Sequence, residues 1–245
     1  MKSYDNRPVI FIGDVHGDWC GLKRTIKNHG VKDCYLICVG DLGIGFSQFI
    51  SKERRVHTSL NEFFLHHNIK FMSIRGNHDD PKYFVVDPPW KFSNFELIPD
   101  YSIKVINGEK YQFVGGAISI DRKCDHRKAG STYWLDEVFD FKPELAEKCD
   151  VLVTHSSPSW SGPVDKNQLI RNLEARDYYL WRDCIAERKD HDLLYAICQP
   201  HIHYAGHFHN YYFTKYNNST SVILDILQLK EHTAYKNERI ILDTK

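Results

Sequence analysis

Short polar segments that follow apolar runs contain the residues of this chain that could do chemistry. The first apolar run, Val9–Ile12, stops at Gly13, and Asp14 and His16 follow. An aspartate oxygen and an imidazole nitrogen two residues apart can face one point, and together they suit a divalent transition metal. Taken alone, such a pair is a weak indication, because turns favour aspartate for other reasons.

Two further apolar runs end in the same way. Residues 35–39 lead into a Gly-Asp pair that contains Asp41, and residues 69–74 lead into a segment that contains Asn77 and His78. Glycine stands beside each of these groups and lets the backbone approach an ion closely. Parallel strands joined by right-handed crossovers have their carboxyl ends at one edge of a sheet. We therefore expect these side chains to meet the first pair at that edge.

Histidines also follow apolar runs in the second half of the chain. Residues 150–154 predict a strand that ends at His155, and His207 and His209 are separated by one residue, so a tight turn can point both rings to one region. The role of the neighbouring His201 and His203 stays open. The complete candidate set is Asp14, His16, Asp41, Asn77, His78, His155, His207 and His209.

Helical segments connect the first predicted strands. Asp18 can cap a helix whose apolar residues recur at helical spacing from Trp19 to Ile26, and Gly30 is typical of its end. Residues 49–67 predict a second helix with one apolar face. Strands that alternate with helices predict an α/β sheet with parallel strands.

The remainder of the chain predicts more strand than helix. Asn107 and Gly108 fit a type I′ turn between strands at 101–106 and 110–114. The further predicted elements are an irregular loop at 81–99 that covers the edge of the site, one or two surface helices within 164–189, and strands at 211–215, 221–229 and 239–242.

Length and charge limit the classes of protein that this chain can represent. A chain of 245 residues can bury a large core, and we expect a single domain over residues 1–245. Lysine plus arginine equals aspartate plus glutamate at 32 each, so net charge does not indicate nucleic acid as a partner, although a local basic groove is not excluded. Composition does not reveal the oligomeric state.

The cysteines and the apolar runs indicate the cellular compartment in which the protein is expected. The 7 cysteines are odd in number, scattered, and never form a C-x-x-C pair, which favours reduced thiols over a disulfide framework. No apolar run reaches the ~18 residues that span a bilayer, and the first eight residues lack the apolar core of a signal peptide. We expect a cytoplasmic protein without a membrane partner.

Five ordered motifs resemble those of the calcineurin-like metallophosphoesterase superfamily. The blocks D-x-H, G-D, G-N-H-[D/E], a lone histidine after a strand, and G-H-x-H occur in that order from Val9 to about His209. The resemblance implies an α/β fold of the mixed α+β kind, a four-layer αββα sandwich with two central mixed sheets flanked by helices. The alternation of strands and helices is compatible with this fold but does not distinguish one sheet from two.

The resemblance also implies a centre with two divalent metal ions. Two cations about 3.5–4 Å apart need a bridging anion, which a carboxylate can supply. Imidazole, carboxylate and amide ligands favour Mn²⁺, with Fe or Zn²⁺ as alternatives, over Ca²⁺. The resemblance assigns one metal to Asp14, His16 and His209 and the other to Asn77, His155 and His207, with Asp41 as the bridge.

By the same resemblance, the reaction is hydrolysis of a phosphate ester. A hydroxide formed between the metals would attack phosphorus, and His78, which is not a ligand, would protonate the leaving oxygen as general acid. Arg122 and Arg127 are candidates for substrate binding, because a guanidinium group matches phosphate oxygens in a bidentate manner. Whether the enzyme is a phosphatase or a phosphodiesterase is left open.

Alternative functions follow from the way in which the motifs depart from known branches. The first and third motifs resemble phosphoprotein phosphatases, but Ile44 and Gly45 stand where that branch has aspartate and arginine in G-D-x-x-D-R-G. The alternatives are a serine/threonine phosphoprotein phosphatase, a nucleotide or nucleic-acid phosphodiesterase and, in a different class, an inactive metal-binding interaction module. The intact motifs argue against the last.

Overall fold

The computed structural model describes residues 6–47 and 49–234, and the strands in these ranges form two mixed sheets. The 5-stranded sheet has the order β11-β1-β2-β3-β4, and the 6-stranded sheet has the order β5-β6-β7-β8-β10-β9. The strands of the first sheet are β1 (Val9–Ile12), β2 (Tyr35–Cys38), β3 (Lys70–Ser73), β4 (Phe95–Leu97) and β11 (Leu229–Glu231). Those of the second are β5 (Ser102–Ile106), β6 (Glu109–Val114), β7 (Val151–Thr154), β8 (Ile202–Ala205), β9 (Tyr212–Tyr216) and β10 (Ser219–Ile223).

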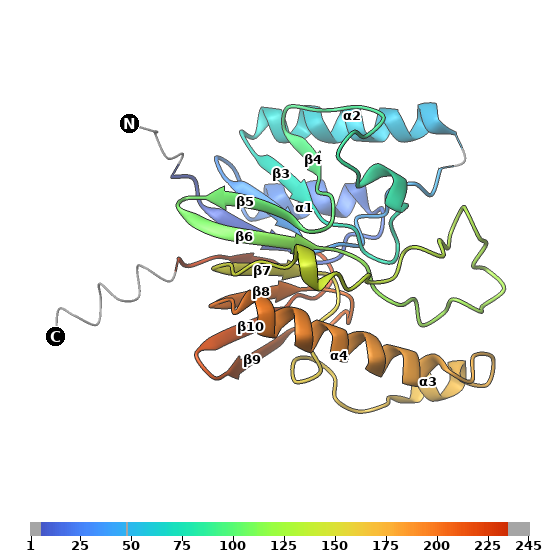
Figure 1. The fold of residues 1–245 in the computed structure, drawn as a ribbon. Coiled ribbons are helices and arrows are strands. Elements are labelled where there is room, and N and C mark those ends of the chain that lie inside the picture. Colours follow the sequence, from blue (N-terminus) through green and yellow to red (C-terminus); the bar gives the residue numbers. More distant parts are fainter. Residues whose placement is uncertain (1–5, 48, 235–245) are drawn as a thin grey trace.

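Helices cover the outer face of each sheet. In Figure 1, α1 (Trp19–Asn28) and α2 (Ile50–His66) lie on one side of the two sheets, and α3 (Gln168–Leu173) and α4 (Leu180–Cys198) lie on the other. Two short 3₁₀ helices, η1 (Pro81–Tyr83) and η2 (Pro143–Leu145), lie in connecting segments. This arrangement confirms the predicted four-layer αββα sandwich.

Apolar side chains fill the space between every pair of layers. Between the sheets, the rings of Phe11 and Tyr204 stack with their centroids 3.7 Å apart. On the outer face of the first sheet, Leu22 of α1 and Phe64 of α2 pack in one buried cluster. On the outer face of the second sheet, Leu194 of α4 belongs to another. Because β1 and β2 are buried on both faces, their sequences are continuously apolar rather than alternating, whereas β3 has Lys70 and Ser73 at its two ends.

Several local predictions are confirmed. The Asp18 side chain accepts a hydrogen bond of 2.8 Å from the backbone N–H of Gly21 and caps α1. Asn107 and Gly108, with φ of 53° and 85°, make the tight turn of the β5–β6 hairpin. Within the first sheet β1, β2 and β3 are parallel neighbours, and in the second sheet β7 and β8 are parallel as well. The carboxyl ends of these strands therefore lie on a common side of each sheet.

Two predicted segments differ in the structure. Residues 81–99 are not an irregular loop throughout, because they contain η1 and β4, and the indole of Trp90 donates a hydrogen bond of 2.7 Å to Nδ1 of His57 on α2. The predicted strand at 221–229 is also wrong. Strand β10 ends at Ile223, Leu227 has a positive φ of 54°, and β11 then pairs antiparallel with β1 in the other sheet.

The remaining elements can be placed briefly. The helical prediction for 164–189 corresponds to α3 and α4. Helix α4 continues beyond the predicted range and ends at Cys198, where Gln199 adopts a left-handed backbone conformation with φ of 47°. The predicted strand at 211–215 corresponds to β9, and the one at 239–242 lies outside the described residues. Along residues 6–47 and 49–234 no helix has the length and apolar character needed to cross a bilayer. All seven cysteines are free thiols.

Candidate metal centre

The loops that follow five parallel strands bring the candidate side chains together. Asp14 and His16 follow β1, and Asp41 follows β2. The loop after β3 contributes Asn77 and His78. In the second sheet, His155 comes directly after β7, and His207 and His209 follow β8. The structure thus joins groups from both sheets at one place, although they are up to about 200 positions apart in the chain.

Left-handed backbone conformations turn several of these side chains toward one another. The φ angles are 50° at His16, 47° at Asp41, 72° at His207 and 50° at His209. Such conformations cost about 1–3 kcal/mol each in residues other than glycine, and they cluster at functional sites. The surrounding structure must offset this strain to keep the four side chains in place.

Two glycines allow the loops to approach closely. A Cβ atom on Gly76 would lie 2.0 Å from Oδ1 of Asp41. A Cβ atom on Gly206 would lie 2.2 Å from Oδ1 of Asp14. Real Cβ atoms do not come this near to an oxygen, so only glycine fits at either position without a shift of the carboxylate.

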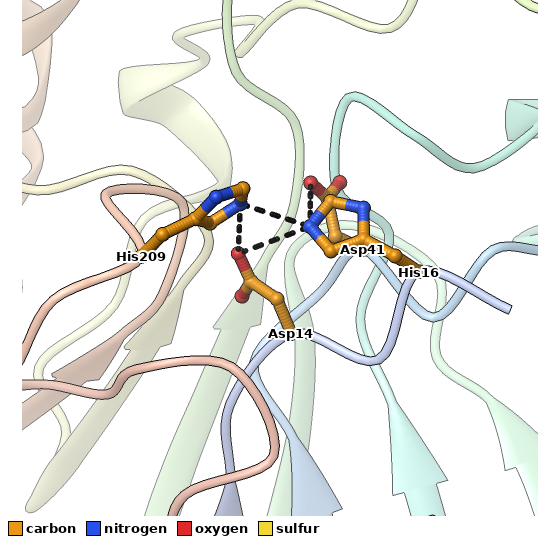
Figure 2. A group of neighbouring side chains, drawn as sticks. All are labelled: Asp14, His16, Asp41 and His209. Carbon is orange, nitrogen blue, oxygen red and sulfur yellow. Dashed lines mark hydrogen bonds and ion pairs between the residues drawn. The ribbon is translucent and has the colours of Figure 1, made fainter. Parts of the chain in front are cut away.

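A first cluster of ligand-type atoms contains Asp14, His16, Asp41 and His209, shown in Figure 2. One potential ligand atom from each residue lies within 4.8 Å of the others. Oδ2 of Asp14 is 3.3 Å from Nε2 of His209, and Oδ2 of Asp41 is 3.7 Å from Nε2 of His16. The two histidine Nε2 atoms are 2.9 Å apart. These atoms surround a point that a divalent cation could occupy.

A second cluster lies on the other side of Asp41. Oδ1 of Asn77 is 3.0 Å from Nε2 of His155 and 2.9 Å from Nδ1 of His207. Oδ1 of Asp41 is 3.1 Å from Nε2 of His155. The two oxygens of Asp41 thus face different clusters, Oδ2 toward the first and Oδ1 toward the second.

The donor set of the second cluster fits a cation. Nδ1 of His155 lies 2.8 Å from the carbonyl oxygen of Val39, and a carbonyl can only accept, so His155 carries a proton on Nδ1. In the neutral ring Nε2 then presents a lone pair to the oxygens of Asp41 and Asn77. Three lone-pair atoms face one another, and a positive charge between them would remove the repulsion.

The pKa values of this pair show the same requirement for positive charge. Burial lowers the pKa of His155, but the Asp41 carboxylate outweighs burial and raises it to about 10. Burial opposes the ionisation of Asp41, yet His155 holds the pKa of Asp41 well below its usual range. Either a proton on His155 or a bound cation would balance the buried negative charge of Asp41.

His78 lies beside the clusters and is held by an arginine. Its backbone N–H donates to Oδ1 of Asp41 at 2.7 Å, and its Nδ1 lies 3.1 Å from Nη1 of Arg127. Because a guanidinium group only donates, Nδ1 of His78 is the acceptor. The proton of the neutral ring is therefore on Nε2.

A buried network fixes Arg127 in turn. Its side chain is only 2% exposed, and its Nη2 donates to Oγ of Ser119 at 2.6 Å and lies 3.3 Å from both oxygens of Glu137. Ser119 also accepts from the amide of Asn77 at 3.0 Å. Burial raises the pKa of Glu137 to about 7 despite the nearby Ser119 and Arg127. No sequence motif marks Ser119 or Glu137, so their position beside Arg127 was not predicted.

Asp79 is a second residue that our sequence analysis left without a role. Its carboxylate is fully buried and accepts hydrogen bonds from the backbone N–H groups of Leu42, Gly43, Ile44 and Gly76, at 2.8–3.1 Å. It therefore ties the loop after β2 to the loop after β3. The only sequence signal is its position directly after His78 in the third motif.

The remaining candidates lie in other surroundings. Arg122 forms ion pairs with Asp177 at 2.5 Å and with Asp183 at 2.7 Å. His203 is fully buried and bonds to Oγ1 of Thr154 at 2.7 Å. His201 is exposed, at the residue before β8.

No curated protein sequence is a significant match to this chain. Among solved structures, the chain is similar to phosphopantetheinyl hydrolase (PptH) from Mycobacterium tuberculosis, with a TM-score of 0.45, 14% identity, and coverage of 92% of this chain and 95% of the other. It is also similar to GAP50, the anchor in the inner membrane complex of Plasmodium, with a TM-score of 0.40, 14% identity, and coverage of 90% and 72%.

A family model provides the decisive comparison. The model of the calcineurin-like phosphoesterases matches residues 7–220, which contain both ligand clusters, His78 and the strands that position them. The match agrees with the two-sheet sandwich and with the metal-ligand geometry described above. The chain belongs to the calcineurin-like phosphoesterase family.

Proposed function

We propose that this protein is a dinuclear metal-dependent phosphoester hydrolase. The observation that supports it most directly is the position of Asp41, whose two oxygens face two separate clusters of ligand-type atoms. One ion would be held by Asp14, His16 and His209 and the other by Asn77, His155 and His207, with Asp41 shared. Mn²⁺ is our first candidate for both positions, with Fe or Zn²⁺ as alternatives, because the donors are imidazoles, carboxylates and an amide.

The cations and the protein would contribute different parts of the chemistry. When bound, two divalent ions supply Lewis acidity toward the phosphoryl oxygens and lower the pKa of a bound water. His78 supplies the proton for the leaving oxygen from Nε2, since Arg127 occupies Nδ1. Of the two arginines predicted to bind the substrate phosphate, Arg127 would act indirectly, by positioning His78. Arg122 already forms ion pairs with the carboxylates of Asp177 and Asp183.

Replacement of Asp41 by asparagine tests the proposal. Asp41→Asn removes the shared negative charge and keeps the shape of the side chain, so we expect hydrolysis of p-nitrophenyl phosphate with added Mn²⁺ to be abolished. Mn²⁺ binding measured by calorimetry should weaken, and the circular dichroism spectrum should stay unchanged. Asp87→Asn, at a side chain that is 93% exposed, is the matched control. Unchanged turnover in Asp41→Asn would refute the mechanism.

The same assay addresses the choice between phosphatase and phosphodiesterase. Turnover of p-nitrophenyl phosphate is compared with turnover of bis-p-nitrophenyl phosphate under the same metal conditions. Against a phosphoprotein phosphatase, Ile44 is fully buried and a Cβ atom on Gly45 would lie 2.2 Å from the Cβ of Asp80. The aspartate and arginine of that branch thus have no counterparts here, and a side chain at position 45 would clash with Asp80. Metal binding without turnover of either ester would favour the inactive interaction module.

Two further proposals concern the whole chain. The match to the family model over residues 7–220 supports a single catalytic domain. Seven free thiols support a reducing compartment such as the cytoplasm.

A further inference from the structure

A pocket of about 640 Å³ adjoins the metal centre. Asp41, His78 and His207 form part of its lining, and its other walls come from the segment 118–126, α3, and the first turns of α4. A phosphate group held at the metal centre would therefore have its ester-linked group next to this pocket. Its volume is in the range of pockets that hold small organic molecules.

Apolar side chains form much of the pocket wall. Ile118 and Ile120 contribute from the segment 118–126, and Leu173 of α3 and Trp181 of α4 contribute from the helices. Trp181 is partly buried, so part of its side chain is accessible. Walls of this kind favour an aromatic or aliphatic group over a hydrated one.

The charges of the pocket are unfavourable for a second anionic group. Outside the candidate metal ligands, its described lining residues include the carboxyl groups of Asp121, Asp165 and Glu187, and Arg188 is their one lysine or arginine. Of these carboxyl groups, Asp121 pairs with Arg127 at 3.4 Å and lies 2.7 Å from His126, and Asp165 is exposed. The Arg188 guanidinium is buried and donates to main-chain carbonyls, including those of Pro158 at 3.0 Å and Ser159 at 3.2 Å. It is occupied by the backbone and is not placed to hold a phosphate.

The arginines closest to this region are engaged elsewhere. Arg122 pairs with Asp177 and Asp183, and the side chain of Arg127 is enclosed by His78, Ser119, Asp121 and Glu137. A ligand with several phosphates, such as a nucleic acid or an acidic phosphopeptide, usually meets arginine forks or a run of lysines. This pocket offers apolar surface and carboxylates in their place.

We propose that the natural substrate is a phosphoester of an apolar, preferably aromatic, organic group that carries no further negative charge, and that this group binds in the pocket between residues 118–126 and α3–α4. The inference rests on the proposed hydrolytic function of the adjoining centre. It excludes polynucleotides, polyphosphates and acidic phosphopeptides as the preferred substrates.

Three monoesters whose phenols have similar acidity test the substrate class. Phenyl phosphate, 2-naphthyl phosphate and 4-carboxyphenyl phosphate are compared by kcat/KM with the Mn²⁺-loaded full chain. The kcat/KM of the naphthyl ester should be about tenfold or more higher than that of the phenyl ester, because the naphthyl group buries a second ring in the pocket. The carboxyphenyl ester should be poorer than the phenyl ester, because its charge would lie near Asp165 and the one arginine of the described lining, Arg188, is bonded to main-chain carbonyls.

A pair of tryptophan variants tests the location. A smaller hollow that also reaches His78 is lined by Trp19, Phe46 and Lys52, and it is the competing position for the organic group. Trp181→Ala should bring the ratio of naphthyl to phenyl turnover close to one. Trp19→Ala, the same substitution in the competing hollow, should leave the ratio unchanged. Ile170→Ala, at a partly buried position of α3, is the second pocket variant should Trp181→Ala not fold.

A binding measurement separates failure of this inference from failure of the proposed function. Calorimetry compares (2-naphthyl)methylphosphonate, which is not hydrolysed, with methylphosphonate on the Mn²⁺-loaded protein, and we expect the naphthyl compound to bind at least about tenfold more tightly. Hydrolysis of all three esters without preference, or a preference lost in Trp19→Ala but kept in Trp181→Ala, would overturn the pocket assignment alone. No hydrolysis of any ester would overturn the proposed function.

Discussion

At the scale of single residues, the hydrogen-bond partner of Nδ1 sets the tautomer of two histidines, His155 and His78. The Val39 carbonyl accepts from Nδ1 of His155, so the lone pair of Nε2 faces Asp41 and Asn77. At His78 the arrangement is reversed, because Arg127 donates to Nδ1 and leaves the proton on Nε2. Under the proposed function, the neutral ring of His155 would accept a cation and the ring of His78 would donate a proton.

Loss of the Arg127 donor should change the tautomer of His78 and slow the reaction. In Arg127→Gln we expect kcat to fall by about 10- to 100-fold, less than the ~10²- to 10⁴-fold that a general acid contributes, because His78 itself is kept. In ¹⁵N-histidine NMR spectra of the metal-free protein, His78 should change from the Nε2–H form to a mixture of tautomers. Arg127→Lys, which keeps a charged donor, should retain part of both effects.

The control for this prediction is Arg176→Gln, at a side chain that is 58% exposed. It should change neither kcat nor the His78 resonances. A large loss of activity in Arg127→Gln with an unaltered His78 spectrum would contradict a positioning role.

At the scale of elements, loops from different strands are held in register by buried polar side chains. Asp79 accepts from three backbone N–H groups of the loop after β2 and from one in its own loop. Burial and the nearby Asp41 raise the pKa of Asp79 to about 7, so the backbone donors stabilise a charge that the interior disfavours. Asp41 is placed by this connection as well as by its own loop.

Removal of the Asp79 carboxylate should loosen both loops. Asp79→Ala leaves three buried N–H groups and the partly buried N–H of Gly43 without their acceptor, and we expect the free energy of unfolding to fall by about 3 kcal/mol or more. Urea unfolding in the presence of a chelator measures this loss apart from any metal effect. Mn²⁺ affinity should also fall. The exposed Asp87→Ala is the comparison, and equal stability of the two variants would rule out this role of Asp79.

His203 connects three strands of the second sheet and should make stability depend on pH. Its ring lies 2.7 Å from Oγ1 of Thr154 at the end of β7 and 2.9 Å from Oγ of Ser221 in β10. Burial lowers its pKa from 6.5 to about 3 in the folded protein. Between these values the unfolded chain binds a proton that the folded chain does not, so stability falls as pH decreases from 6.5 toward 3.

The contribution of His203 is measured by replacement. It amounts to at most about 1.4 kcal/mol per pH unit, the value for one proton. His203→Gln should reduce the slope of unfolding free energy against pH in this window, and the exposed His66→Gln serves as control. Identical slopes in His203→Gln and wild type would show that His203 does not account for the acid sensitivity.

At the scale of the whole molecule, the metal centre lies where two sheets meet. Asp14, His16, Asp41 and Asn77 come from loops of the first sheet, and His155, His207 and His209 come from loops of the second. Ligation would therefore connect the two halves of the sandwich across their shared apolar core. Each half alone contains only part of either cluster.

Metal removal should accordingly lower the stability of the entire fold. A ligand that binds only the folded state at 100 times its dissociation constant adds about 2.7 kcal/mol. We expect Mn²⁺ to raise Tm and EDTA to return it to the metal-free value, with Ca²⁺ giving a smaller shift. The Mn²⁺ shift should be strongly reduced in Asp41→Asn. An equal shift in that variant would mean that Mn²⁺ binds elsewhere.

The sequence by itself determined the features that depend on neighbouring residues. Apolar runs that end at glycine predicted the strands, Asp18 predicted the start of α1, and Asn107-Gly108 predicted the hairpin. The order of the motifs predicted which side chains would meet at the strand ends. These features are local because a cap, a turn or a strand end is set by a few adjacent residues.

Only the tertiary structure decided how distant segments pair. It assigned each strand to one of the two sheets, divided 221–229 between β10 and the approach to β11, and placed Arg127 on His78, where the type of residue alone indicated a phosphate ligand. Glu137, 59 positions after His78, had no sequence signal at all. The physical reason is that sheet register and buried charge networks depend on contacts between residues far apart in the chain, which local patterns do not encode.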